Sequence, residues 1–309
     1  MSNPLIKAQV ALGALSSAVM LGAGSAAAQE LVGKPVDWQW WHQDAASPGM
    51  QAIIDFDILT LYVIVPITLL VMALLAYVMV KFRASSNPVP SKTTHHTWLE
   101  VGWTVGPVLV LLILAIPSFK LLTRQFTPPE PPSVTIKATG YQWYWGYEYQ
   151  GEQEVAFEAR PIGSAEIAGS IEAAAQEREN LGKTDLETYP NLLAVDNEVV
   201  VPVGKVIRLL VTAGDVIHDW AMPVFGIKMD GIPGRLNEVY FQPTKEGIFY
   251  GQCSELCGKY HAYMPIAVRV VSEERYAAWL AGAADDVEGA NRALMATIEQ
   301  DKTINVAGN

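Results

Sequence analysis

Two long apolar segments without a charged side chain stand out in the first part of the chain. Residues 58–80 form an uncharged stretch of 23 residues, and residues 101–119 form one of 19. Each stretch is long enough to cross the hydrocarbon core of a bilayer as a helix. Both contain proline, which membrane helices tolerate where neighbouring groups satisfy the freed backbone. The pattern predicts a transmembrane helical hairpin over residues 58–122.

Beyond a proline-rich linker at residues 127–133, the apolar pattern becomes that of short β-strands. Aromatic side chains occupy alternate positions in residues 141–149, which places them on one face of an extended chain. Further strand-like runs cover residues 197–213, 238–253 and 262–271. Short strands at this spacing are typical of a Greek-key sandwich or barrel. The chain is therefore predicted to be a membrane-anchored all-β protein.

The N-terminal region carries export signals. Residues 1–28 combine a lysine, a short apolar region and a small-residue end, which favours a cleaved signal peptide over a third membrane helix. Residues 29–57 then form an exported N-terminal segment. The loop at residues 81–100 contains three basic side chains, as expected for the inner side of a membrane. We therefore expect both mature termini to face the outer side of the membrane; with the family resemblance described below, that membrane would be the bacterial inner membrane and that side the periplasm.

Two further segments differ from the strand pattern. The insertion at residues 160–190 is rich in Ala, Glu and Gln, and is expected to be a surface excursion in which Ser170 caps a short helix. Ser272 is a second expected helix cap after the last strand. Residues 282–309 are small and polar, and we expect them to form a loosely ordered tail.

Charge is distributed unevenly along the chain. Residues 1–120 contain six basic and six acidic side chains, so the whole net charge of −11 lies on the exported part. Such an acidic surface raises the rate of encounter with a cationic protein, and the rate falls with added salt. A basic protein partner is implied, and nucleic acid is excluded as a partner.

The only two cysteines, Cys253 and Cys257, precede His261 and Met264 in the sequence GQCSELCGKYHAYMP. Thiolate, imidazole and thioether groups are soft ligands that select copper or zinc over magnesium or calcium. His218 is the only other histidine beyond residue 96. A mononuclear blue-copper site uses a single cysteine. The second thiolate therefore indicates two metal ions bridged by the pair.

Two other interpretations of the cysteine pair stay open on the sequence alone. A disulfide is common in exported proteins, but so short a closed loop stabilises little and leaves His261 and Met264 unexplained. An anchored copper chaperone also uses a cysteine pair and a distant histidine. No nucleophile–base pair is evident in the sequence, which favours electron transfer over chemistry on a substrate.

Three segments, GQCSELCGKYHAYMP, VIHDW and YQWYWGYEY, resemble subunit II of the haem–copper cytochrome c oxidases. The resemblance extends from the first membrane segment to about residue 280. It implies a two-helix transmembrane hairpin followed by a cupredoxin-like Greek-key β-barrel over residues 123–281. A quinol-oxidising relative would lack the copper ligands, and a fused haem variant would need a Cys-x-x-Cys-His motif that this sequence does not contain.

The resemblance also implies the binuclear copper centre CuA and its ligands. Cys253 and Cys257 would bridge both copper ions, with His218 and His261 as terminal ligands, one to each metal. The weak ligands would be Met264 and the backbone carbonyl of Glu255. The subunit would accept electrons one at a time from reduced cytochrome c and pass them to haem in subunit I, where O2 is reduced to water.

Further roles follow from the same resemblance, each with a plainer alternative. Trp143 would be the residue through which electrons enter, or else a core aromatic. Glu255 would share a Mg2+ ion with subunit I, or else be a solvated loop acid. Glu100 would mark the entrance of a proton path, or else only stabilise a helix N-terminus. The acids expected to dock cytochrome c are Glu148, Glu158, Asp196 and Asp215.

Overall fold

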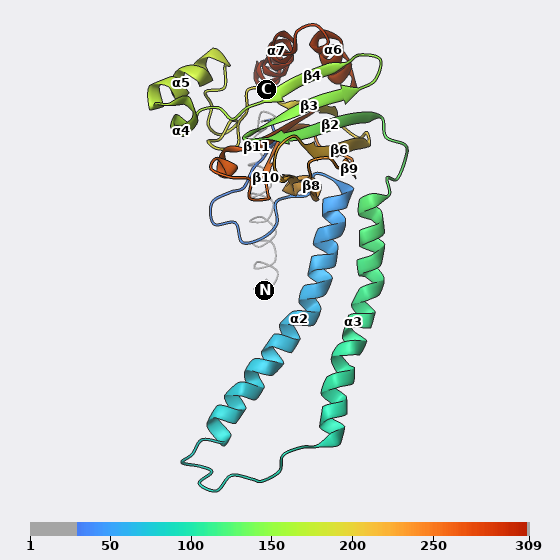
Figure 1. The fold of residues 1–309 in the computed structure, drawn as a ribbon, viewed down its shortest axis with the longest axis vertical. Coiled ribbons are helices and arrows are strands. Elements are labelled where there is room, and N and C mark those ends of the chain that lie inside the picture. The colour runs from blue at the N-terminus through green and yellow to red at the C-terminus, as the bar shows by residue number, and fades with distance from the viewer. Residues whose placement is uncertain (1–29, 308–309) are drawn as a thin grey trace, which may run out of the picture.

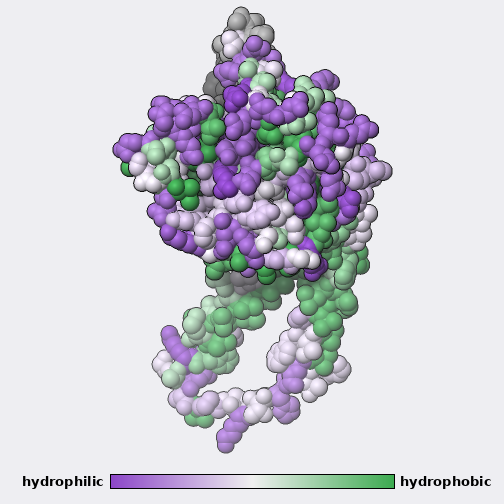
Figure 2. All heavy atoms as spheres, turned by 45° about the horizontal axis from the view of Figure 1, so that its top comes forward, coloured by the Kyte–Doolittle hydropathy of each residue, from purple (hydrophilic) through white to green (hydrophobic). Residues whose placement is uncertain are grey.

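The computed structural model describes residues 30–307, in which two long helices carry a β-domain at one end (Figure 1). Helix α2 spans Pro48–Lys81 and helix α3 spans Thr97–Phe126. Both are long and apolar enough to cross a membrane. Apolar side chains cover them below a mostly polar domain (Figure 2). The predicted hairpin is confirmed, whereas the expected signal peptide lies outside the described residues.

Helix α2 begins ten residues before its uncharged stretch. Ser47 is the N-cap and its hydroxyl accepts a hydrogen bond from the backbone N–H of Met50. The same hydroxyl donates to the carbonyl of Phe225 in the β-domain, 2.8 Å away. This double use of Ser47 fixes the outer end of the helix to the domain that it carries.

The β-domain consists of two sheets that pack face to face. The first contains, in spatial order, β5 (Val199–Pro202), β11 (Pro265–Val271), β10 (Gly247–Cys253), β7 (His218–Met222) and β8 (Ile227–Gly231), with β1 (Val32–Gly33) pairing beside β10. The second contains β4 (Val155–Ala159), β3 (Tyr144–Gln150), β2 (Val134–Tyr141), β6 (Ile207–Ala213) and β9 (Asn237–Phe241). Trp220 and Tyr147 meet between the sheets, where the indole donates to the phenol at 3.1 Å. This arrangement, a β-sheet domain behind a helical hairpin, confirms the predicted membrane-anchored all-β fold.

The expected single strand over residues 141–149 is wrong. Strand β2 ends at Tyr141 and β3 begins at Tyr144, so Gln142 and Trp143 form the turn between two paired strands. The backbone N–H of Gln142 donates to Asp215 at 2.7 Å, a contact 73 residues away in the chain. Aromatic alternation continues through the turn, which is why the sequence pattern hides it.

The run at residues 197–213 likewise divides into two strands, β5 and β6. A turn that includes Gly204 separates them, and its φ of +75° suits glycine. The run at 238–253 divides in the same way into β9 and β10. Short 3-10 helices, η2 (Pro223–Phe225) and η3 (His261–Tyr263), connect the later strands.

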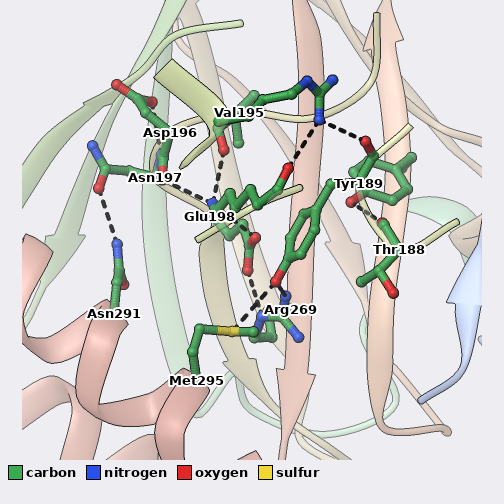
Figure 3. Close-up of polar contacts among 12 residues, drawn as sticks. Thr188, Tyr189, Val195, Asp196, Asn197, Glu198, Arg269, Asn291 and Met295 are labelled. Carbon is green, nitrogen blue, oxygen red and sulfur yellow. Dashed lines mark hydrogen bonds and ion pairs between the residues drawn. The ribbon is translucent and has the colours of Figure 1, made fainter. Parts of the chain in front are cut away.

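The insertion forms two short helices, α4 (Ala165–Ala168) and α5 (Ile171–Asn180). Ser170 caps α5 as expected, since its hydroxyl accepts from the N–H of Ala173. A buried ionic cluster attaches the insertion to the sheet (Figure 3). In it, Lys183 lies 3.0 Å from the carboxylate of Glu198, and Arg269 pairs with the same carboxylate.

The expected loosely ordered tail is wrong. Helix α6 (Glu273–Ala283) is capped by Ser272, as predicted, and is followed by helix α7 (Val287–Ala307). Ala290 and Leu294 are spaced one helical turn apart and are both buried. Asn291 accepts a hydrogen bond from the buried indole of Trp279 at 2.8 Å. Small residues at helical spacing pack here as an amphipathic helix, which their low hydrophobicity concealed.

Candidate metal centre

The predicted metal ligands meet at one end of the first sheet. Cys253 is the last residue of β10, Cys257 lies in the following loop, and His261 begins η3. Met264 directly precedes β11, so the ligand loop joins β10 to β11. His218 is the first residue of β7, which pairs with β10.

Each thiol faces a different histidine. The two sulfur atoms of Cys253 and Cys257 are 3.8 Å apart. Sγ of Cys253 lies 3.9 Å from Nδ1 of His218, and Sγ of Cys257 lies 3.5 Å from Nδ1 of His261. The carbonyl of Glu255 is 3.3 Å from Sγ of Cys253. Thus the two sulfur atoms lie at the centre of the site, with the imidazole of His218 beside Cys253 and that of His261 beside Cys257.

The site is shielded from water. His218 is fully buried, and Cys253, Cys257 and Met264 are each no more than 3% exposed. Only His261 is half-buried. Both cysteines are free, and their sulfur separation is far above the roughly 2.05 Å of a disulfide. The donor set of soft sulfur and nitrogen atoms in a dry pocket fits copper.

The protonation of the thiols depends on their neighbours. Burial raises the pKa of the Cys253 thiol, but hydrogen bonds with His218 and with the backbone of Asp219 outweigh it and lower that pKa. At Cys257, burial and the negative charge of Cys253 both raise the pKa. Cys257 therefore retains its proton more readily than Cys253, and a bound cation favours the thiolate form of both residues.

A carboxylate orients His218 from behind. Oδ1 of Asp215 lies 2.8 Å from Nε2 of His218, which leaves Nδ1 directed toward Cys253. A hydrogen-bonded carboxylate commonly fixes the ring orientation of a metal-binding histidine. The carboxylate also accepts from the backbone N–H groups of Gln142 and Val216. Asp215 was predicted to dock a partner, but the structure places it as support for His218.

Gly140 supplies the space that His218 occupies. A Cβ atom at Gly140 would lie 2.7 Å from Cδ2 of the imidazole, closer than side-chain carbons approach one another. Trp145 bounds the ring on another side, with centroids 6.0 Å apart. Neither Gly140 nor the role of Asp215 was identified from the sequence, because both act through contacts with residues far along the chain.

Trp143 is directly connected to the ligand loop. Its indole Nε1 donates to the carbonyl of Cys257 at 3.2 Å, and the side chain of Gln142 donates to the same oxygen at 2.8 Å. The ring is half-buried and packs edge-on against Tyr260. Trp143 lies in the turn between β2 and β3 and not in a strand, but it is partly buried and packs against the core, so the alternative of a core aromatic holds in part.

The other predicted acids are in different environments. Glu148 and Glu158 are exposed on β3 and β4, where they pair with Lys137 and Arg160. Asp196 instead accepts hydrogen bonds from the backbone N–H groups of Arg160 and Asn197, both at 2.7 Å. Burial raises its pKa. The carboxylate of Asp196 thus has internal partners, contrary to the docking role that we expected.

The two remaining predicted residues differ in exposure, since Glu255 is exposed and Glu100 is half-buried. Glu255 lies at the surface of the ligand loop, between the two cysteines. Glu100 is in the first turn of α3 and accepts a hydrogen bond from the backbone N–H of His96 at 3.1 Å. This end of the hairpin is opposite the β-domain (Figure 1). Its contact is that of a helix-capping carboxylate.

Comparison with known proteins matches both parts of the chain. The family described as cytochrome c oxidase subunit II, periplasmic domain, matches residues 134–271, and the family described as its transmembrane domain matches residues 35–121.

Similar full-length proteins cover both of these parts. Cytochrome c oxidase subunit 2 of Cereibacter sphaeroides is 44% identical over 86% of this chain and 89% of its own length. A probable cytochrome c oxidase subunit 2 of Rickettsia conorii is 42% identical over 80% of this chain and 73% of its own. The solved periplasmic domain of subunit II from Bradyrhizobium japonicum is 47% identical over 50% of this chain and 95% of its own, with a TM-score of 0.41.

Proposed function

This chain belongs to the cytochrome c oxidase subunit II family, and we propose that it takes electrons from cytochrome c and delivers them to haem in subunit I. It is a membrane-anchored subunit of a haem–copper oxidoreductase complex with a periplasmic domain. In this complex the oxygen chemistry is carried out by subunit I, where O2 is reduced to water. The chain itself relays electrons along the respiratory chain.

The observation that carries the proposal is the pairing of each thiol with its own histidine. Cys253 and Cys257 would bridge two copper ions, with His218 on one metal and His261 on the other. Met264 and the carbonyl of Glu255 would complete the set as weak ligands. When bound, the two copper ions supply a redox centre that gains and loses one electron.

The protein's contribution is to hold these ligands still. Strands β7 and β10 fix His218 and Cys253 on adjacent backbones, and Asp215 fixes the ring of His218. Because the ligands are buried, few water molecules have to reorient when the charge of the copper centre changes. A site whose geometry barely changes when the charge changes has a small reorganisation cost, which suits rapid electron transfer and not bond-making on a substrate.

Trp143 provides the proposed route from the surface. Its hydrogen bond to the carbonyl of Cys257 makes a short continuous path from a half-exposed indole to a sulfur ligand. Glu148 and Glu158 lie on the strand next to this turn and on its neighbour, and their exposed carboxylates suit a basic cytochrome. We assign docking to these two acids and no longer to Asp196 and Asp215.

Three finer assignments remain proposals. Glu255 would contribute one carboxylate to a Mg2+ ion whose other ligands come from subunit I, since one carboxylate cannot form such a site. Glu100 would take up protons at the inner surface, in addition to its capping contact. Both mature termini and the copper domain would face the periplasm across the bacterial inner membrane, as the basic loop at residues 81–100 supports.

Rapid mixing of reduced cytochrome c with the assembled oxidase tests the proposed order of electron transfer. Absorbance of the copper centre should change first, and haem absorbance should follow. Haem reduction without an earlier copper phase would overturn the proposal. The same experiment at rising ionic strength tests docking, because screening reduces attraction between exposed charges.

A further inference from the structure

Three tryptophans near the N-terminal end of the described chain have no part in the proposed function. The side chains of Trp38 and Trp40 are 98% and 89% exposed, and Trp41 is 38% exposed. They lie in residues 34–46, which we call the tryptophan loop. Large aromatic side chains exposed side by side are uncommon on a water-facing surface and indicate a contact with another apolar phase.

Both ends of the tryptophan loop are attached to the β-domain. Before it, β1 pairs with β10, and at its far end Ala46 exchanges backbone hydrogen bonds with Val224 and Thr244 at 2.9 and 2.8 Å. Ala46 itself is 1% exposed. The loop is therefore a defined part of the fold and not a free end.

The tip of the loop holds Trp38 in an uncommon backbone conformation. Its φ of +61° lies in the left-handed region, which side chains other than glycine rarely adopt. Two hydrogen bonds close the turn: the backbone N–H of Gln39 donates to the carbonyl of Val36, and the backbone N–H of Val36 donates to the side-chain oxygen of Gln39. The backbone conformation of Trp38 is therefore unfavourable in free energy, although its indole is almost fully exposed.

One contact between the loop and α2 fixes the position of the loop along the axis of this membrane helix. Nε2 of His42 lies 3.0 Å from Oδ2 of Asp57 in α2. Asp57 is the last charged residue before the uncharged stretch 58–80. Trp41 packs edge-on against His42, and Trp40 lies against Trp41, with centroids 5.3 and 5.9 Å apart. The linked rings therefore lie where the hydrocarbon region of α2 begins.

Figure 1 shows the same relationship at the scale of the fold, with the loop hanging below the β-domain beside the outer part of α2. We propose that Trp38, Trp40 and Trp41 insert into the lipid headgroup layer on the side of the β-domain. An indole combines a large apolar ring with one N–H donor, and it concentrates at this boundary in membrane proteins.

The charges around the rings indicate which lipids they contact. The one lysine of the loop, Lys34, is paired with Glu187, whereas Asp37 and Asp44 lie in the same loop and Asp57 lies behind it on the helix. These carboxylates would repel anionic headgroups, so the loop suits zwitterionic lipids such as phosphatidylcholine or phosphatidylethanolamine. Together with α2 and α3, the loop gives the β-domain a third attachment to the membrane, which restrains its tilt over the bilayer.

Depth-dependent fluorescence quenching of the full chain in phosphatidylcholine vesicles tests this inference. The emission of the triple variant Trp38→Phe, Trp40→Phe, Trp41→Phe is subtracted from that of the unaltered chain, and the difference belongs to the loop. A nitroxide on the lipid headgroup should quench this difference several-fold more than one deep in the acyl chain. The matched control is Trp279→Phe, whose buried indole should respond to neither nitroxide.

Two outcomes would overturn the inference. Quenching of the loop emission by aqueous iodide, with no response to either nitroxide, would place the rings in water. A loop emission that is shielded from iodide and from both nitroxides in the assembled oxidase would place them against another protein subunit. Far-UV circular dichroism of the variants checks that the phenylalanine substitutions leave the fold intact.

Discussion

The indole of Trp143 donates a hydrogen bond to the backbone carbonyl of Cys257 across 3.2 Å. These two residues are 114 positions apart in the chain, and a turn and a loop of the β-domain bring them together. The contact connects the molecular surface by a single hydrogen bond to the backbone of Cys257, whose side chain carries one of the two sulfur atoms. It also separates two properties that mutation can test, copper binding and electron uptake.

Trp143→Phe should slow electron uptake without removing copper. The phenyl ring retains the packing against Tyr260, but the hydrogen bond to Cys257 is lost. We expect reduction by cytochrome c to slow by about tenfold, which corresponds to about 1.4 kcal/mol in activation free energy. Stopped-flow kinetics and metal analysis of the same sample check this, and a variant that lacks copper would show that Trp143 has a structural role.

Gly140→Ala should weaken the metal site, because the added methyl group would occupy the position of the His218 ring. Gly140 lies in β2 and His218 lies in β7, so pairing with neighbouring strands holds both backbones in place. The imidazole side chain therefore has to move away from Cys253. We expect loss of copper on dialysis while the β-domain stays folded. Gly151→Ala is the matched control, since a Cβ atom there would meet nothing within 4 Å. Equal copper retention in the two variants would contradict the assigned role of Gly140.

Asp215→Ala should lower copper affinity, whereas Glu148→Gln should affect only the association with cytochrome c. Loss of Asp215 frees the ring of His218, and loss of such a supporting carboxylate typically lowers metal affinity by about 10- to 100-fold. Glu148→Gln should leave copper content unchanged but slow association with cytochrome c and reduce its salt dependence. Copper titrations and association rates measured at two salt concentrations distinguish the effects. Normal copper affinity in Asp215→Ala would return this residue to the docking surface.

Glu198 should make the stability of the domain sensitive to acid. Burial raises the pKa of its carboxyl, but Arg269 and Lys183 outweigh burial and lower it to about 2, below the ordinary value of 4.5. The stabilisation is therefore complete above about pH 4.5 and is lost as the pH falls toward 2. At neutral pH, Glu198→Gln leaves Arg269 partly unpaired and should cost about 3–5 kcal/mol.

Thermal unfolding of the unaltered chain and of Glu198→Gln across this pH range checks the prediction. The difference in melting temperature should be largest near neutral pH and should shrink between about pH 4.5 and 2. Glu187→Gln is the control, because its carboxylate pairs with Lys34 at the surface and is largely exposed. A pH-independent difference for Glu198→Gln would show that packing, and not charge, explains its effect.

The sequence predicted those features that depend on local pattern or on rare residue types. Two uncharged stretches identified α2 and α3, and the loop with both cysteines identified most of the metal site. The turn at Gln142 and Trp143 was missed because alternating aromatics run through it. Gly140 and Asp215 were missed because their roles depend on His218, which strand pairing brings to them. Such long-range contacts leave no mark on a local pattern.

Copper content combined with electron paramagnetic resonance of the purified full chain tests the bridging role of Cys253 and Cys257 most directly. We expect two copper ions per chain and a spectrum in which one unpaired electron is shared equally between them. Cys253→Ser and Cys257→Ser should each abolish this shared signal. One copper ion per loaded chain, or a shared signal that survives either substitution, would rule out the thiolate bridge.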